Sequence, residues 1–258
     1  MNVRRTAVPF LGFAALAVLA GCEPPMTTPR AIFLDCAGWY SGDGPVRAGL
    51  RAGGFDGAVD RFGWQSLLGP LHDHLTATRS HPDTARLADR VAKLRAANPT
   101  GRIVLIGYSV GSSILVSALE KLPEDVQVDH VVLLAPSVSS RHDLTTALRH
   151  VRGRLYATSS PHDGLLPGVA AAGLESGRPA GLVGFRLPEP MTRETRKLYR
   201  KLVPLPWRPA YAMYGWDGGH MSITRSDFIR VVIAPRISTD QPHPLDRSLI
   251  GLEATHGK

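Results

Sequence analysis

The chain has few cysteines for disulfides and no dense cluster of metal-ligating residues. Of its 258 residues only two are cysteines, Cys22 and Cys36, so a disulfide framework is excluded. The closely spaced histidines and aspartates at 72–74 and 162–163 are too sparse to indicate a metal site. Hydrophobic residues make up 43% of the chain, which is enough for the core of one domain. We therefore expect stability to come from a single core.

The chain also lacks the patterns that accompany binding to nucleic acids. Its 30 Lys and Arg residues against 22 Asp and Glu residues give a formal net charge of +8. No aromatic-basic motif or recognisable nucleic-acid module accompanies this charge, so we expect no nucleic-acid partner. Internal repeats and low-complexity tracts are absent as well. A basic protein of this kind can instead meet anionic lipids or other polyanions.

The first 21 residues have the pattern of an export signal. Arg4 and Arg5 precede an apolar run, 11–19, that is too short to span a bilayer. The run ends in Leu-Ala-Gly-Cys, which resembles the lipobox of bacterial lipoproteins, where cleavage precedes the cysteine and that cysteine is acylated. The resemblance implies lipidation of Cys22 and an exported protein anchored to the periplasm-facing surface of a membrane of the cell envelope. An ordinary secretory signal is the alternative.

Cleavage before Cys22 removes two arginines, so the formal charge falls from +8 to +6. Acylation of Cys22 also leaves Cys36 without a partner in the chain, so we expect no disulfide. Residues 22–30 are rich in Pro and Thr and are expected to form an extended tether. The folded domain is expected at 31–237, followed by a loosely ordered tail at 238–258.

Short apolar runs alternate with amphipathic segments from Ala31 onward, which is typical of a mostly parallel sheet flanked by helices. The expected strands are 31–35, 57–62, 102–108, 128–135, 154–159 and 181–185. The expected helices are 45–52, 82–97, 110–121, 143–150 and 165–174. Five prolines and a charged segment mark 187–209 as a lid-like insertion instead of another regular repeat.

A turn that carries a nucleophile is indicated at residues 107–111, Gly-Tyr-Ser-Val-Gly. Gly107 and Gly111 leave room for a tight turn around Ser109. The pentapeptide follows a buried apolar strand and opens a helix of small residues, which is the setting that such a turn requires. A simple glycine-rich turn is the alternative. The motif in its setting resembles the nucleophile elbow of the α/β-hydrolases, a resemblance that covers 31–237 without the first two strands of larger members.

The family resemblance predicts an acid and then a histidine after the nucleophile. A serine hydroxyl needs a base to take its proton, and the base needs an acid to fix its tautomer. His220 follows the last strand-like run in a Gly-Gly-His sequence and is the predicted base. Asp163 follows the strand at 154–159 and is the predicted acid, with a helix N-cap as the alternative role. Asp217 and Asp143 are the reserve candidates.

The resemblance also implies two backbone N–H groups that stabilise an oxyanion. Val110 is the expected first donor, and Ala37, on the loop after the first strand, is the expected second. In that loop Asp35 and Cys36 stand where the family has His-Gly, and we expect Cys36 to be a packing residue. The implied chemistry is attack by Ser109 on an acyl carbonyl and hydrolysis of the acyl-enzyme, with no metal or organic cofactor.

Five cations within the expected insertion recur at helical spacing, namely Arg193, Arg196, Lys197, Arg200 and Lys201. A solvated helix face is the simpler interpretation. On a tethered protein the same segment can be a lid or rim that lies against anionic headgroups. The aromatic stretch 207–216 can line an acyl pocket or pack beneath the loop of His220.

These patterns favour a serine hydrolase of the esterase or lipase kind, which cleaves a carboxylic ester of a small-molecule or lipid acyl substrate. Acyl transfer and amide cleavage use the same three side chains, and the sequence does not separate them from ester hydrolysis. An idle fold that serves as an envelope binding module is the third reading. The complete set of Ser109, Asp163 and His220 argues against it.

Overall fold

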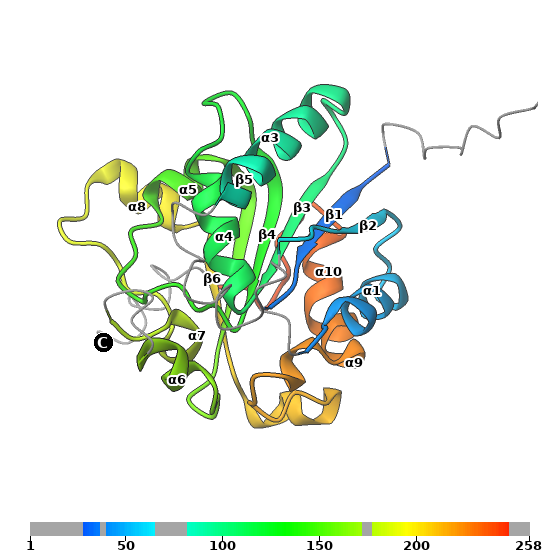
Figure 1. Ribbon diagram of the computed structural model, residues 1–258, viewed down its shortest axis with the longest axis vertical. Helices are drawn as coiled ribbons and strands as arrows, with labels where there is room; N and C mark the ends of the chain where they lie inside the picture. The colour runs from blue at the N-terminus through cyan, green and yellow to red at the C-terminus, as the bar shows by residue number, and fades with distance from the viewer. Residues whose placement is uncertain (1–27, 37–39, 65–81, 172–176, 248–258) are drawn as a thin grey trace, which may run out of the picture.

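The structure is a computed structural model that describes residues 28–36, 40–64, 82–171 and 177–247. Its strands form one sheet in the order β2-β1-β3-β4-β5-β6 (Figure 1), and all neighbouring strands are parallel. The strands are β1 Arg30–Leu34, β2 Ala58–Arg61, β3 Ile103–Tyr108, β4 Val128–Leu134, β5 Val151–Ser159 and β6 Leu202–Pro206. Because the strands share one direction, their carboxyl ends lie together, where ligands bind in open parallel sheets.

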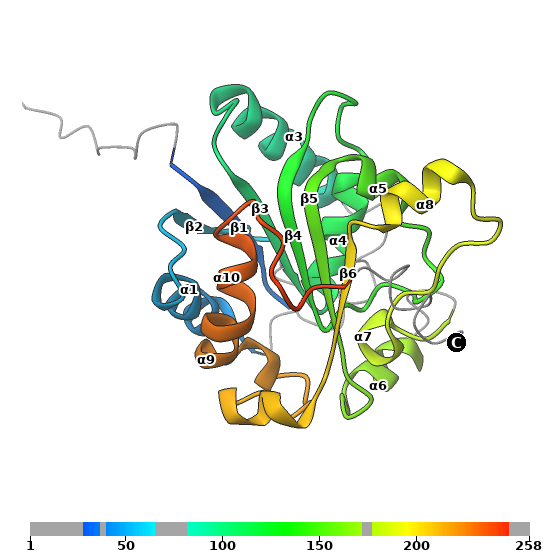
Figure 2. The same ribbon diagram turned by 180° about the vertical axis from the view of Figure 1, so that it is seen from behind.

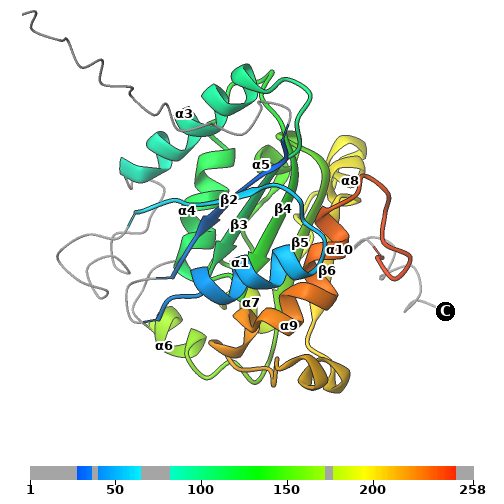
Figure 3. The same ribbon diagram turned by 90° about the vertical axis from the view of Figure 1, so that its right-hand side faces the viewer.

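Helices cover both faces of this sheet. Figures 2 and 3 show α1, α9 and α10 on one face and α3, α4 and α5 on the other. The α-helices are α1 Asp43–Ala52, α3 Pro82–Ala97, α4 Val110–Leu119, α5 Thr145–Arg149, α6 Leu166–Ala171, α7 Ala180–Val183, α8 Arg193–Tyr199, α9 Ser226–Phe228 and α10 Ala234–Ile237. Two 3-10 helices, η1 Pro209–Tyr214 and η2 Ser222–Thr224, and a π-helix, η3 Ile229–Ile233, complete the described elements.

The strands divide their side chains between two cores. In β1, Ile32 and Leu34 pack with residues of α3, α4 and α5, whereas Ala31 and Phe33 pack with residues of α1, α9 and α10. Successive side chains of a strand point to opposite faces, so a strand covered on both faces is apolar at every position. This packing explains the continuous apolar runs of β1 and β3, and the expected parallel sheet flanked by helices is confirmed.

The expected strand at 181–185 is wrong, because α7 occupies Ala180–Val183 instead. The sixth strand is β6, which lies inside the segment 187–209 that was expected to be an insertion. Its two prolines, Pro204 and Pro206, are tolerated because β6 is an edge strand. The backbone N–H of Trp207 donates to the carbonyl of Ser159 on β5 at 2.7 Å. The alternation of a strand then directs positions 204 and 206 to the free edge, where no N–H is needed.

The described part of the expected tail, 238–247, contacts the domain. The guanidinium of Arg102 donates to the carbonyl of Ser238 at 2.7 Å and pairs with Asp240 at 2.9 Å. Arg236 pairs at 2.9 Å with the buried carboxylate of Asp246. The expected signal peptide 1–21, Cys22 and most of the tether 22–30 lie outside the described residues. In the part of the chain that the structure describes, the helices are too short or too polar to cross a membrane.

Candidate active site

The candidate nucleophile sits on a strained turn between β3 and α4. Ser109 has φ 54° and ψ −122°, a backbone conformation that costs on the order of 1–3 kcal/mol in a residue other than glycine. A Cβ on Gly107 would lie 2.7 Å from the Cα of Ser112, and a Cβ on Gly111 would lie 2.6 Å from the carbonyl oxygen of Leu34. Both glycines are therefore required by close backbone approach.

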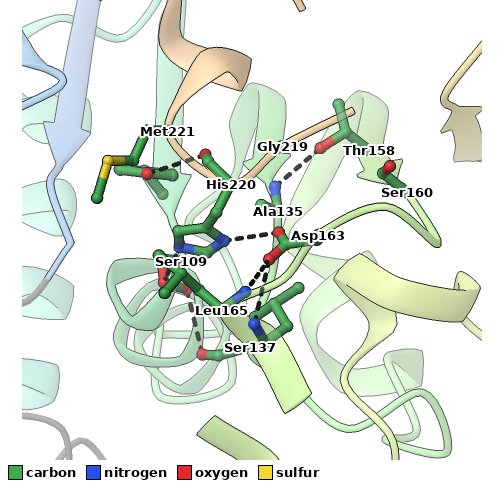
Figure 4. Close-up of polar contacts among 12 residues, drawn as sticks. Ser109, Ala135, Ser137, Thr158, Ser160, Asp163, Leu165, Gly219, His220 and Met221 are labelled. Atoms are coloured by element: carbon green, nitrogen blue, oxygen red, sulfur yellow. Dashed lines mark hydrogen bonds and ion pairs between the residues drawn. The ribbon is translucent and has the colours of Figure 1, made fainter. Parts of the chain in front are cut away.

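The structure brings the three predicted side chains together in one hydrogen-bonded chain (Figure 4). Nε2 of His220 lies 2.9 Å from Oγ of Ser109, and Nδ1 of His220 lies 2.6 Å from Oδ2 of Asp163. An ionised carboxylate can only accept, so Nδ1 carries the proton and Nε2 is free to accept the serine hydroxyl. Ser109, Asp163 and His220 follow β3, β5 and β6 respectively, and all three are buried.

The carboxylate of Asp163 combines the two roles that the sequence left open. Its second oxygen, Oδ1, accepts from the backbone N–H groups of Leu165 at 3.0 Å and Leu166 at 3.1 Å, at the start of α6. Asp163 therefore caps a helix with one oxygen and orients His220 with the other. These bonds fix the carboxylate, whose residue is only 3% exposed.

The two reserve acids have other partners. Asp143 accepts from the backbone N–H of Thr145 at 2.9 Å and from the hydroxyl of Tyr199 at 3.2 Å. Asp217 accepts from the hydroxyl of Ser222 and from the backbone N–H of Gly219, and these bonds lower the pKa of its carboxyl. Asp217 thus braces the loop that carries His220 but does not contact its imidazole ring.

Tyr108 supports the base, which the pattern of the pentapeptide does not reveal because its second position is variable. Its hydroxyl donates to the backbone carbonyl of His220 at 3.0 Å, and the centroids of the two rings are 5.2 Å apart. Burial raises the pKa of Tyr108, so the hydroxyl remains a donor. The residue that precedes the nucleophile therefore connects β3 to the loop of His220.

Hydrogen bonds from serine residues stabilise the strained turn through the backbone carbonyl of Ser109. The carbonyl oxygen of Ser109 accepts from the backbone N–H of Ser112 at 3.0 Å and from the hydroxyl of Ser137 at 3.2 Å. The hydroxyls of Ser113 and Ser137 are 2.9 Å apart. Sequence reasoning noted the small residues after the elbow but did not assign Ser137, which arrives from the loop after β4.

The oxyanion donors are placed only in part. The N–H of Val110 begins α4 directly after Ser109, whereas Ala37 lies outside the described residues. Asp35 shapes the described start of that loop, because its buried carboxylate accepts from the N–H of Cys36 at 2.9 Å, the hydroxyl of Ser41 at 2.8 Å and the N–H of Gly42 at 3.1 Å. The carboxylate therefore draws both ends of the loop together.

Cys36 behaves as expected of a packing residue. Its thiol donates to the carbonyl of Tyr40 at 3.0 Å. Burial, followed by the adjacent charge of Asp35, raises the pKa of the Cys36 thiol to about 12. A thiol that stays protonated at neutral pH is a poor nucleophile.

The aromatic stretch 207–216 packs against α9, which follows the loop of His220 in the chain. Trp216 is buried, and its ring lies 4.7 Å from that of Phe228 and 5.5 Å from that of Tyr211, measured between centroids. Side chains that flank the candidate site are apolar and exposed, with Leu165 at 44% and Met221 at 47%. In the described part of the chain, no group of three or more His, Cys, Asp or Glu side chains is arranged to hold a metal.

The basic segment is not positioned to cover the candidate nucleophile and so does not form a lid over it, whereas its contact with anionic headgroups stays a prediction. Helix α8 packs against α5 and ends just before β6 begins, and Leu202, the first residue of β6, pairs with Leu155 in the middle of β5. The helix therefore lies toward the amino end of the sheet (Figure 1), whereas Ser109 directly follows β3 and so lies at the carboxyl end. Lys201 is not part of the predicted basic helix face, because its ammonium donates to the carbonyls of Leu148 and Val151.

Comparisons with known proteins concern the fold. No protein-family model and no curated protein matches the chain. Est1E from Butyrivibrio proteoclasticus is 11% identical over 82% of this chain and 87% of its own, with a TM-score of 0.46. A lipase-esterase related protein from Clostridium acetobutylicum is 14% identical over 83% of this chain and 93% of its own, with a TM-score of 0.43. A predicted CIB-like hydrolase from Thermoplasma acidophilum is 16% identical over 83% and 88%, with a TM-score of 0.40.

Proposed function

We propose that this protein is a serine hydrolase that cleaves a carboxylic ester or a related acyl bond. The observation that carries the proposal is the continuous hydrogen-bonded chain from Ser109 through His220 to Asp163, on a strained turn at the carboxyl end of a parallel sheet. A strained nucleophile beside a base that is itself oriented by an acid is the arrangement that activates a serine hydroxyl.

The proposed reaction has two steps. Oγ of Ser109 attacks the acyl carbonyl while Nε2 of His220 takes its proton, and Asp163 stabilises the imidazolium through Nδ1. The negative charge on the former carbonyl oxygen is stabilised by the N–H of Val110 and by a second donor, for which we propose Ala37. His220 then returns the proton to the leaving alcohol, and a water deprotonated by His220 hydrolyses the acyl-enzyme and restores Ser109.

Labelling with a fluorophosphonate tests this proposal directly. The reagent reacts with an activated serine hydroxyl, so the wild-type protein should be labelled and the Ser109→Ala variant should not. Ser117→Ala is the matched control because Ser117 is another buried serine of α4 that does not belong to the hydrogen-bonded chain. Labelling that persists in Ser109→Ala, or its absence from folded wild-type protein, would contradict the proposal.

Substrate class is tested on matched esters and amides. A series of p-nitrophenyl esters of increasing acyl length should be hydrolysed with a burst whose amplitude equals the amount of enzyme, because the acyl-enzyme accumulates. The corresponding p-nitroanilides should react far more slowly, since p-nitroaniline is a poorer leaving group than p-nitrophenolate. Faster turnover of the anilides would assign the site to amide cleavage, and product formation that requires an added alcohol would assign it to acyl transfer.

We further propose that the protein is exported and anchored to the bacterial cell envelope through acylated Cys22. The Leu-Ala-Gly-Cys sequence after a short apolar run supports this localisation. Mass spectrometry of the mature protein should find an acylated amino-terminal Cys22, and Cys22→Ala should abolish the membrane retention that resists high salt. An unacylated amino terminus downstream of Cys22 would refute the anchor without affecting the proposed chemistry.

A further inference from the structure

A basic pocket lies at the end of the sheet opposite Ser109. It has a volume of about 320 Å³ and is formed by β4, the start of β5, the turn before β6 and the segment after α10. Four cationic residues line it, namely Arg152, Arg154, Arg200 and Lys201, of which Lys201 also donates from its ammonium to the carbonyls of Leu148 and Val151. Asp240 is the one acidic residue among the described lining residues. The pocket therefore has a surplus of positive charge.

Neighbouring ion pairs do not cancel this surplus. Asp240 is already paired with Arg102 at 2.9 Å. Arg152 pairs with Asp129 at 3.1 Å, but the same carboxylate also binds Arg95 at 2.7 Å. In and beside the pocket, two carboxylates, those of Asp129 and Asp240, therefore stand against six cations. The cations are Arg95, Arg102, Arg152, Arg154, Arg200 and Lys201.

The other titratable groups of the pocket do not add negative charge. Burial lowers the pKa of His130, and its Nδ1 accepts from the backbone N–H of Arg154, so the ring is neutral and Nε2 faces the carbonyl of Thr239. Burial and then the nearby charge of Lys197 lower the pKa of Lys201. A bound anion would relieve this repulsion between cations. Arginine forks and a lysine ammonium together match the oxygens of a phosphate group.

The register of the sheet places the start of β1 at the same height along the strand direction as this pocket. Arg30 of β1 pairs with Ile103, Val104 pairs with His130, and His130 pairs with Arg154. Three strand spacings, about 14 Å, therefore separate the start of β1 from the pocket wall in β5. Figure 1 shows the start of β1 and α8 toward the same end of the molecule, with α6 and α7 toward the other.

The tether and the cations thus converge on one surface. An extended chain from Cys22 to Arg30 reaches at most about 28 Å, so an anchored protein keeps this end of the sheet near the bilayer. Exposed cations of α8 continue the basic surface beside the pocket, namely Arg193, Arg196 and Lys197. Near an anionic bilayer such cations are attracted within about one Debye length, which is about 8 Å at physiological ionic strength.

We infer that the pocket of Arg152, Arg154, Arg200 and Lys201 binds the phosphate of an anionic phospholipid headgroup, with the amino end of the sheet facing the membrane. The orientation rests on the proposed anchor, whereas the headgroup contact does not. Ser109 follows β3, whose six residues span about 20 Å, at the far end of the sheet. The candidate active site then faces away from the bilayer to which the protein is anchored, and acyl substrates reach it from the aqueous side.

Vesicle sedimentation tests the headgroup contact. The chain from Glu23 to Lys258 contains every described strand and helix and lacks the proposed anchor. It should sediment with vesicles of phosphatidylglycerol and phosphatidylcholine but not with phosphatidylcholine alone, and added salt should weaken the binding. Equal binding to both vesicle types would overturn the inference.

Matched double variants localise the contact. Arg154→Gln with Arg200→Gln removes two pocket cations, whereas Arg208→Gln with Arg225→Gln removes two exposed cations at the carboxyl end of the sheet. Apparent vesicle affinity should fall at least about tenfold for the pocket pair and less than about threefold for the other pair. The reverse order would overturn the inferred orientation. Thermal unfolding confirms that both variants are folded.

Two further measurements separate this inference from its alternatives. Calorimetric titration with inorganic phosphate distinguishes a soluble ligand, because tight phosphate binding without vesicle binding would contradict the lipid headgroup. Turnover of a soluble p-nitrophenyl ester by the Arg154→Gln, Arg200→Gln variant should equal that of wild type, since Ser109 is distant. If the variant loses vesicle binding but keeps full turnover, the result supports the inference. If the wild-type protein binds vesicles but shows no turnover, the result refutes the proposed hydrolase activity and leaves the headgroup contact standing.

Discussion

Replacing Asp163 by asparagine separates its two roles. One carboxylate oxygen lies 2.6 Å from Nδ1 of His220, and the other accepts from the backbone N–H groups of Leu165 and Leu166. An amide of the same shape can keep its oxygen toward the two N–H groups and turn its NH2 group toward His220. Because NH2 only donates, Nδ1 must become the acceptor, and the proton moves to Nε2.

The magnitude follows from this change of tautomer. With a proton on Nε2, His220 cannot accept the hydroxyl proton of Ser109, so we expect Asp163→Asn to lower kcat/KM about 10⁴-fold. This loss corresponds to about 5 kcal/mol of transition-state stabilisation. The free energy of unfolding should fall by only about 1 kcal/mol, because both backbone bonds of the cap remain.

Stopped-flow acylation by a p-nitrophenyl ester measures the rate, and denaturant unfolding measures the stability of the same variant. Asp217→Asn is the control, since Asp217 accepts from the N–H of Gly219 at 2.8 Å and an amide oxygen preserves that bond. We expect the control to retain activity within about threefold of wild type. An acylation rate of Asp163→Asn near that of wild type would refute the assignment of Asp163 as the acid. If the loss of rate were explained by the fraction of unfolded variant, the change of tautomer would not be its cause.

Three other predictions test the turn, the support of the base and the buried thiol. Gly111→Ala should destabilise by roughly 1–3 kcal/mol in denaturant unfolding because its Cβ would lie 2.6 Å from a carbonyl oxygen, whereas Gly44→Ala, with nothing within 4 Å, should not. Tyr108→Phe should lower kcat several-fold with KM unchanged, since the lost bond to His220 is worth about 1 kcal/mol; an unchanged kcat would refute this. In Cys22→Ala protein, iodoacetamide should alkylate Cys36 at pH 8 at least about a hundredfold faster in urea than in the folded state, and equal rates would contradict its raised pKa.

The amino-acid sequence alone determined the features that depend on neighbouring residues. An apolar run before Gly-Tyr-Ser-Val-Gly predicts β3 and its turn, because a Cβ on Gly107 would meet Ser112 of the same turn, so this steric constraint is local. Periodic apolar positions predict α3 over the same residues that the structure shows. The order of Ser109, Asp163 and His220 along the chain is likewise a property of the sequence, and it pointed to the one candidate acid that lies within hydrogen-bond distance of His220 in the structure, at 2.6 Å.

Tertiary structure decided the features that depend on distant segments. β6 was missed because proline is unfavourable in a strand unless the outer edge of a sheet is free, and only the pairing with β5 shows that edge. Tyr108 and Ser137 were missed because their partners come from other loops. The basic segment lies at a different end of the sheet from the one expected of a lid. A periodic pattern defines a helix face but not the end of the sheet on which the helix lies. The register of six parallel strands places α8 and the basic pocket at one end and Ser109 at the other.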